Sequence, residues 1–183
     1  MSKPIIDIMN QKFILELNAA LAMENAGIER LQTRIKEVSL PEAKQQLEHH
    51  LEESLEHQKI LEQIIISIGG EPTQEKLGLP LPSYPVDMKA MMDKSMTKQE
   101  YELKRAEEDM ILENAEVCSY LMMIQKCQMA GGVYLNAIDP LSKNMQDEQN
   151  QADWIKTNSP NMLVQLWPKI QSAVAASAPS FSL

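Results

Sequence analysis

Apolar residues along this chain recur at alternating steps of three and four, a spacing that predicts amphipathic helices. Four long segments carry the pattern, at about 5–38, 39–68, 97–131 and 133–156, and a short last helix is predicted from Ser159. Few segments alternate with the two-residue period of a strand. We therefore predict an all-α protein.

Two helix starts have the spacing of a capping box, in which a Ser or Thr and a Glu three residues later bond to each other's backbone N–H groups. They are Ser39 with Glu42 before the second helix and Thr97 with Glu100 before the third. Both pairs mark positions where we expect the chain to begin a new helix.

The connection at 70–96 is long, rich first in proline and then in methionine, and its Met-rich end predicts a short turn of helix. A helix of about 28 residues is roughly 42 Å long. A connection of this length can run back along such a helix, as one crossover architecture of four-helix bundles requires. We predict a four-helix bundle with this long crossover between helices 2 and 3 and a short C-terminal helix. It forms a single domain over 1–175, with a mobile tail over 176–183.

The apolar face of each long helix is interrupted by polar residues near its middle. The interrupting residues are Glu24, Glu113 and Glu148 in the first, third and fourth helices, and His50, Glu53 and His57 in the second. Helices joined by short loops are antiparallel neighbours. The two predicted hairpins therefore place one glutamate from each helix at about the same level of the bundle.

Four ionised carboxylates at one level of a core would repel one another, and each would cost several kcal/mol to desolvate. They can be protonated, paired with buried Lys or Arg, or bound to divalent metal. The nearby apolar faces supply no Lys or Arg. We therefore prefer a metal site, and a polar core without metal is the alternative. Carboxylates with imidazole favour iron or manganese over zinc, and two ions bridged by carboxylates are the known arrangement in bundles.

The sequence departs from the usual dinuclear pattern, in which two helices each carry a Glu-x-x-His motif. All three histidines lie in the second helix, and Gln151 stands where a histidine would follow Glu148. Glu116, one turn after Glu113 on nearly the same face, is predicted to compensate as a further ligand. One of the two core-facing histidines would supply the neutral nitrogen ligand.

The net charge of -9 argues against a nucleic-acid partner and suits the attraction of cations. The longest apolar runs fall far short of the roughly 20 residues of a membrane-spanning helix, and the first residues lack the pattern of a signal peptide. Cys118 and Cys127 lie on opposite faces of one predicted helix, so they cannot pair within it. We expect a cytoplasmic protein with no membrane partner.

Three stretches, "ALAMENAGIERLQ", "HHLEESLEHQKILEQIIISIGGEP" and "ILENAEVCSYL", resemble the YciF-like branch of the ferritin-like superfamily, a bacterial and archaeal group linked to stress responses. The resemblance covers about 10–155. It implies a ferritin-like bundle, a homodimer and a dinuclear metal centre. The positions that match its acidic core are Glu24, Glu53, Glu113, Glu116 and Glu148, and His50 opens its "HLEE" motif. Asn114 stands where the family often has His.

The sequence supports three functional hypotheses. The preferred one is a ferritin-like oxidoreductase with two iron or manganese ions that reacts with oxygen or peroxide under stress. The second is a non-catalytic, dimeric helical scaffold whose metal site is structural or vestigial. The third is iron storage, which is disfavoured because nothing in the sequence indicates a cage.

Overall fold

The computed structural model describes residues 5–78 and 96–177. The elements in this part are helical: α1 (Ile5–Glu37), α2 (Pro41–Ser67), α4 (Lys98–Ala130), the 3₁₀ helix η1 (Gly132–Ala137) and α5 (Ile138–Ser177). Within the described residues there is no strand. The prediction of an all-α four-helix bundle is therefore confirmed.

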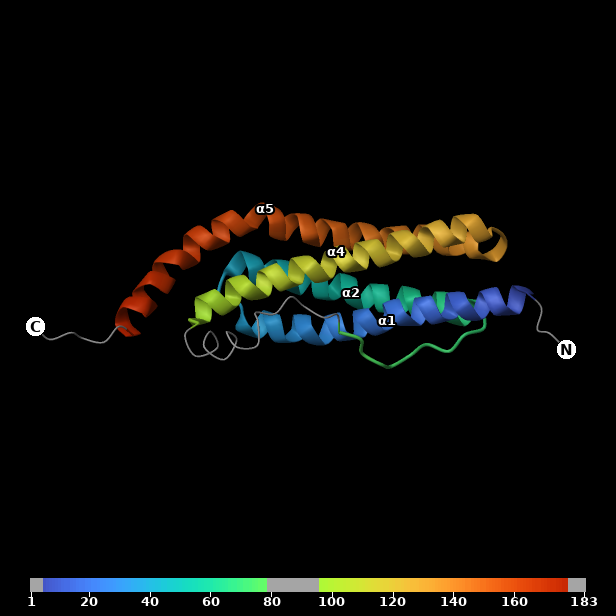
Figure 1. Cartoon of the computed structure of the whole chain (residues 1–183), viewed down its shortest axis with the longest axis horizontal. Helices are drawn as coiled ribbons and strands as arrows, with labels where there is room; N and C mark the ends of the chain where they lie inside the picture. Colours follow the sequence, from blue (N-terminus) through green and yellow to red (C-terminus); the bar gives the residue numbers. More distant parts are fainter. Residues whose placement is uncertain (1–4, 79–95, 178–183) are drawn as a thin grey trace, which may run out of the picture.

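The four long helices form two antiparallel hairpins, α1 with α2 and α4 with α5 (Figure 1). The hairpins pack with α1 beside α4 and α2 beside α5. Helices α2 and α4 run in the same direction, so the chain must return along the bundle between them (Figure 1). The predicted Met-rich turn of this crossover lies outside the described residues.

The first part of the crossover is held against α1 by a row of asparagines spaced about two helical turns apart. Asn10 donates to Ile68 O at 2.7 Å, and Asn18 donates to Glu71 O at 3.1 Å. Asn25 donates to the carbonyl oxygens of Thr73 at 3.4 Å and Glu75 at 2.9 Å. Leu77 N also donates to Ala22 O at 2.8 Å. Side-chain amides on α1 thus satisfy backbone groups of an extended segment that has no sheet partner.

The start of α2 differs from the prediction. The N-cap residue is Leu40, which makes no side-chain capping bond, so a capping box of Ser39 with Glu42 is wrong. Glu102 of α4 takes the capping role, because its carboxylate accepts from Ser39 N at 2.8 Å, Ser39 Oγ at 2.6 Å and Leu40 N at 3.2 Å. A cap supplied from another helix leaves no local sequence signal.

The capping box at the start of α4 is confirmed. Thr97 Oγ1 accepts from Glu100 N at 3.2 Å, and Thr97 N donates to the Glu100 carboxylate at 2.5 Å.

The short C-terminal helix predicted from Ser159 is not a separate element, because α5 continues through it to Ser177 with Pro160 and Pro168 in its interior. Ser159 Oγ donates to Ile155 O at 2.5 Å instead of capping a new helix. Such a bond to the preceding turn, together with proline, bends a helix without ending it. The last part of α5 curves away from its first part (Figure 1). Of the predicted tail, residues 176 and 177 belong to α5, and 178–183 lie outside the described residues.

Two apolar clusters form the core. One contains Leu17, Leu21, Leu61 and Tyr120, and the other contains Leu40, Ala106, Ile155, Met162 and Leu166. Along the sequence, buried polar residues lie between the residues of one cluster and those of the other. They are Glu24, His50, His57, Glu113 and Glu148. No helix in the described part of the chain is both long and apolar enough to cross a membrane.

Candidate metal centre

Two triads of buried side chains meet at Glu148. The first is Glu24, His57 and Glu148, and the second is His50, Glu113 and Glu148. His57 Nδ1 lies 2.9 Å from Glu148 Oε1 and 3.3 Å from Glu24 Oε1. His50 Nε2 lies 3.0 Å from Glu113 Oε2 and 3.4 Å from Glu148 Oε2. Each oxygen of Glu148 thus faces a different histidine, which is the arrangement of a carboxylate that bridges two cations.

The four long helices each contribute to this cluster. Glu24 comes from α1, Glu113 from α4 and Glu148 from α5, whereas α2 supplies both histidines. His50 and His57 are two turns apart on one face of α2, or about 10.5 Å along its axis. Both rings nevertheless contact the same carboxylate. The usual dinuclear pattern has a histidine three residues after Glu148, and this sequence lacks it. Helix α2 can supply the second nitrogen ligand instead.

The outer nitrogen of each histidine faces a carboxylate nearer the surface. His57 Nε2 lies 3.3 Å from Asp147 Oδ2, and His50 Nδ1 lies 3.3 Å from Glu53 Oε2. Asp147 is also held by Lys143 at 3.1 Å. A carboxylate on the outer nitrogen fixes the orientation of an imidazole and favours a free lone pair on its inner nitrogen.

Tyr120 anchors the first triad from the apolar side. Its hydroxyl donates to Glu24 Oε1 at 2.5 Å and accepts from Asn144 Nδ2 at 3.2 Å. One oxygen of Glu24 is therefore held in place by α4, which restricts the carboxylate to one orientation.

Several buried polar atoms of the triads have no hydrogen-bond partner among the described residues: His57 Nδ1, Glu113 Oε2 and both oxygens of Glu148. They lie close to other nitrogen or oxygen atoms but without hydrogen-bond geometry. Buried polar atoms without partners are rare and costly. Convergent lone pairs from carboxylates and imidazoles are the donors of a divalent cation, so the residues present fit a metal ion at each triad.

Comparison with known proteins places the chain in a family. The model of a domain of unknown function, DUF892, matches residues 9–166. The chain belongs to the DUF892 family. This family is of a ferritin-like helical type. No curated protein matches the sequence.

The DUF892 chain is also similar to a crystal structure of a protein from Xanthomonas campestris pv. campestris. The TM-score is 0.71 at 16% sequence identity, and the match covers 88% of this chain and 98% of the other. At this identity the likeness shows the fold alone.

The electrostatics of the DUF892 site reflect its burial and its excess of carboxylates. Burial raises the pKa of Glu148 well above its ordinary value, and the charges of Glu116, Glu24 and Glu113 add to this effect. Burial also raises the pKa of Glu116, with a further contribution from Glu24 and Glu113. Both groups hold a proton more tightly than an exposed glutamate does.

In the second triad, the pKa values of His50 and Glu113 shift in the directions that favour their charged forms. Burial opposes the charged form of His50, but Glu113, Glu53 and Glu116 outweigh it and raise the pKa of the imidazole well above 6.5. Burial likewise disfavours ionised Glu113, but the charge of His50 outweighs it and lowers the pKa of this carboxyl. Without metal, His50 and Glu113 thus form an ion pair, and a cation must replace the proton on His50.

The structure brings together five of the seven residues that the sequence singled out as ligands: Glu24, His50, His57, Glu113 and Glu148. Glu53 instead contacts the outer nitrogen of His50, and it also lies 3.3 Å from the exposed His49. Glu116 lines a cavity together with Glu24, His50 and Glu113. That these seven bind metal stays a prediction.

Tyr120 lies in the core, as its place on the apolar face of the third predicted helix indicates, and its hydroxyl also bonds to Glu24. Sequence reasoning missed two other supporting residues, Asp147 and Asn144. Asp147 and Asn144 lie one and four residues before Glu148, so their position on α5 was the available signal. Neither interrupts the apolar pattern in a way that predicts a contact with His57 or Tyr120.

Proposed function

We propose that this DUF892 protein is a YciF-like, ferritin-like metalloprotein that binds two iron or manganese ions and reacts with oxygen or peroxide in a stress-related role. The observation that carries the proposal is the pair of buried triads that share Glu148. One ion would be held by Glu24 and His57, and the other by His50 and Glu113. Glu148 would bind both ions, and Glu116 would be a further ligand of the second ion.

The donor set supports the choice of metal. Each triad offers two carboxylates and one imidazole, which suit iron and manganese, whereas structural zinc sites favour cysteine. Cys127 lies in an apolar cluster and Cys118 is exposed, so neither thiol belongs to a triad. Bound iron or manganese would supply the electrons for reduction of oxygen or peroxide. The two free thiols also fit the proposed cytoplasmic location.

This chain's residues would set the properties of such a centre. Asp147 and Glu53 orient the two histidines, and Tyr120 fixes Glu24. His57 and Glu148 have no exposed surface (0%), so bulk water does not contact them. A low dielectric strengthens the attraction between a cation and these carboxylates.

The second candidate function is a dimeric helical scaffold with a structural metal. The observation that favours it is that the ligand candidates come from α1, α2, α4 and α5, so bound ions would cross-link the bundle. Metal would then raise stability without redox chemistry.

Metal analysis of protein purified without chelator, followed by a reactivity assay, tests the proposal. We expect about two equivalents of iron or manganese per chain and loss of most of this metal in Glu148→Gln. The exposed Glu52 of α2 provides a control, since Glu52→Gln should keep the metal. A metal content below about 0.2 equivalents per chain contradicts the proposal. Metal-loaded, reduced protein that reacts with neither oxygen nor peroxide supports the scaffold instead.

A further inference from the structure

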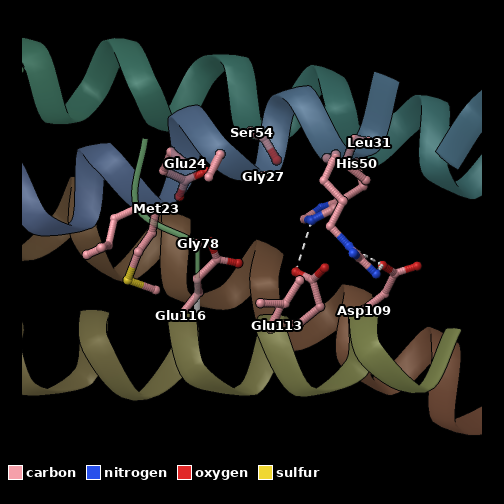
Figure 2. Close-up of a pocket in the computed structure, with 14 residues that line it drawn as sticks. Met23, Glu24, Gly27, Leu31, His50, Ser54, Gly78, Asp109, Glu113 and Glu116 are labelled. Carbon is pink, nitrogen blue, oxygen red and sulfur yellow. Dashed lines mark hydrogen bonds and ion pairs between the residues drawn. The ribbon is translucent and has the colours of Figure 1, made fainter. Parts of the chain in front are cut away.

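A cavity of about 210 Å³ lies between α1, α2 and α4 and extends from the surface to Glu24, His50 and Glu113. Its outer end is formed by the exposed Leu77 and Gly78 of the crossover. At its inner end, Glu113 and Glu116 of α4 point toward Glu24 and the ring of His50 (Figure 2). The cavity therefore gives small molecules a route to the carboxylates from one side of the bundle.

The walls of the cavity are mainly apolar. The apolar side chains are those of Met23, Ala26, Leu31, Leu77 and Leu112. The polar groups that line it include the carboxylates of Glu24, Glu113 and Glu116, the ring of His50 and the hydroxyl of Ser54. Such a surface suits a molecule with an apolar body and one hydroxyl group, which can donate its hydrogen to a carboxylate oxygen.

Positive charge in the wall is already neutralised. Arg30 lies 2.7 Å from Asp109 and 3.1 Å from Glu108, and it is the one guanidinium or ammonium group among the described lining residues. His50 faces Glu53, Glu113 and Glu148. Without bound metal, an anionic ligand would meet the carboxylates of Glu24, Glu113 and Glu116 and no free cation, so the metal-free cavity disfavours acids and phosphates.

Gly27 keeps the inner end of the cavity open. A Cβ at this position would meet only Glu116 Oε1, at 3.9 Å, so a larger side chain would project into the space beside that carboxylate. Gly27 lies inside α1 and is not among the glycines with positive φ, so the backbone does not require glycine here. Glycine is unfavourable inside a helix, which makes the space itself the physical reason for this residue.

We propose that this cavity binds a small, uncharged organic molecule that carries a hydroxyl group, next to Glu113 and Glu116. A cavity of about 150 Å³ is large enough for benzene, whereas pockets for drug-sized ligands measure roughly 300–1,000 Å³. The volume here therefore selects molecules of about the size of one aromatic ring. The inference rests on the proposed function, since the cavity ends at the proposed centre, and it names the class of co-substrate that the centre would meet.

Titration with benzyl alcohol and with benzoate, followed by NMR of the full-length protein after its metal has been removed with a chelator, tests the proposal. The two probes are similar in size and differ in charge. We expect benzyl alcohol to bind at least tenfold more tightly than benzoate and to shift resonances of Gly27 and Leu112. Gly27→Leu should weaken benzyl alcohol binding at least tenfold. The control Ala19→Leu, at an exposed position of α1, should leave it unchanged.

The proposal is overturned if benzyl alcohol does not bind, if benzoate binds as well, or if Gly27→Leu binds the alcohol normally. Circular dichroism and thermal unfolding establish that each variant is folded, and if Gly27→Leu is not, Ala26→Leu fills the same cavity from the neighbouring position. The metal content of each protein is measured separately. Alcohol binding without metal binding would refute the proposed function and support the cavity as a binding site. Metal binding without alcohol binding would support the proposed function and refute the cavity as a binding site.

Discussion

His50 and His57 lie on one face of α2, and each directs one ring nitrogen at Glu148 and the other at a carboxylate nearer the surface. The two rings use different atoms for the inner contact, Nε2 in His50 and Nδ1 in His57. A single helix can thus serve both halves of a dinuclear site, and a Glu-x-x-His motif on the fourth helix becomes unnecessary.

Removal of either histidine should leave one half of the centre intact. We expect His50→Ala and His57→Ala each to reduce bound metal from about two equivalents per chain to about one, because each triad loses its imidazole. His49→Ala serves as the control, since His49 is exposed and belongs to neither triad. Elemental analysis measures the change. Two equivalents in both core variants would show that the histidines are not ligands.

The outer carboxylates should tune the site without being needed for it. We expect Asp147→Asn and Glu53→Gln to weaken metal binding about 10- to 100-fold while the stoichiometry at saturating metal stays the same, as for other groups that orient a metal-bound histidine. Competition with a chelator measures the affinity. If Glu53→Gln instead loses one full equivalent, Glu53 binds metal directly, as the sequence predicts.

The stability of the metal-free protein should fall as pH rises. The pKa values of Glu148 and Glu116 are raised above 4.5 and that of His50 above 6.5. Groups with raised pKa values stabilise the folded state fully below their ordinary pKa, and this contribution is lost as pH rises through the folded-state value. Urea unfolding from pH 4.5 upward measures the slope. Metal-free Glu148→Gln should show a smaller slope, and an unchanged slope would contradict the assignment.

The same protons make metal binding dependent on pH in the opposite direction. Glu148, Glu116 and His50 must lose their protons before they can coordinate a cation. Metal affinity should therefore rise with pH above 6.5, and binding should release protons. Calorimetry in buffers of different ionisation enthalpy counts these protons, and binding without proton release would be inconsistent with these ligands.

The protein should be less stable with Gly27 than with alanine at this position. We expect Gly27→Ala to stabilise the protein by about 1 kcal/mol, because alanine has the better helix propensity and its Cβ has room. Gly70 is the contrasting position, since a Cβ there would lie 2.9 Å from the side chains of Ile14 and Ile65. Gly70→Ala should therefore destabilise, and urea unfolding compares the two variants. A loss of stability in Gly27→Ala would show that the cavity has no room for a methyl group.

Local sequence patterns predicted most of the fold. The three- and four-residue spacing predicted the helices, and glutamates that interrupt it predicted the buried layer at Glu24, Glu113 and Glu148. The errors arose where distant parts of the chain decide local structure. Glu102 caps α2 from α4, and Ser159 bonds backward within α5 rather than starting a helix. The division between inner ligands and outer carboxylates, as for Glu53, depends on which side of an imidazole faces the core.

Anomalous diffraction at the iron and manganese absorption edges, from crystals of protein purified without chelator, tests the central claim most directly. The account predicts two anomalous peaks inside the bundle, one in contact with Glu24 and His57 and one with His50 and Glu113, with Glu148 bound to both. The absence of a peak, or a peak that does not contact Glu148, would contradict a dinuclear centre at these residues.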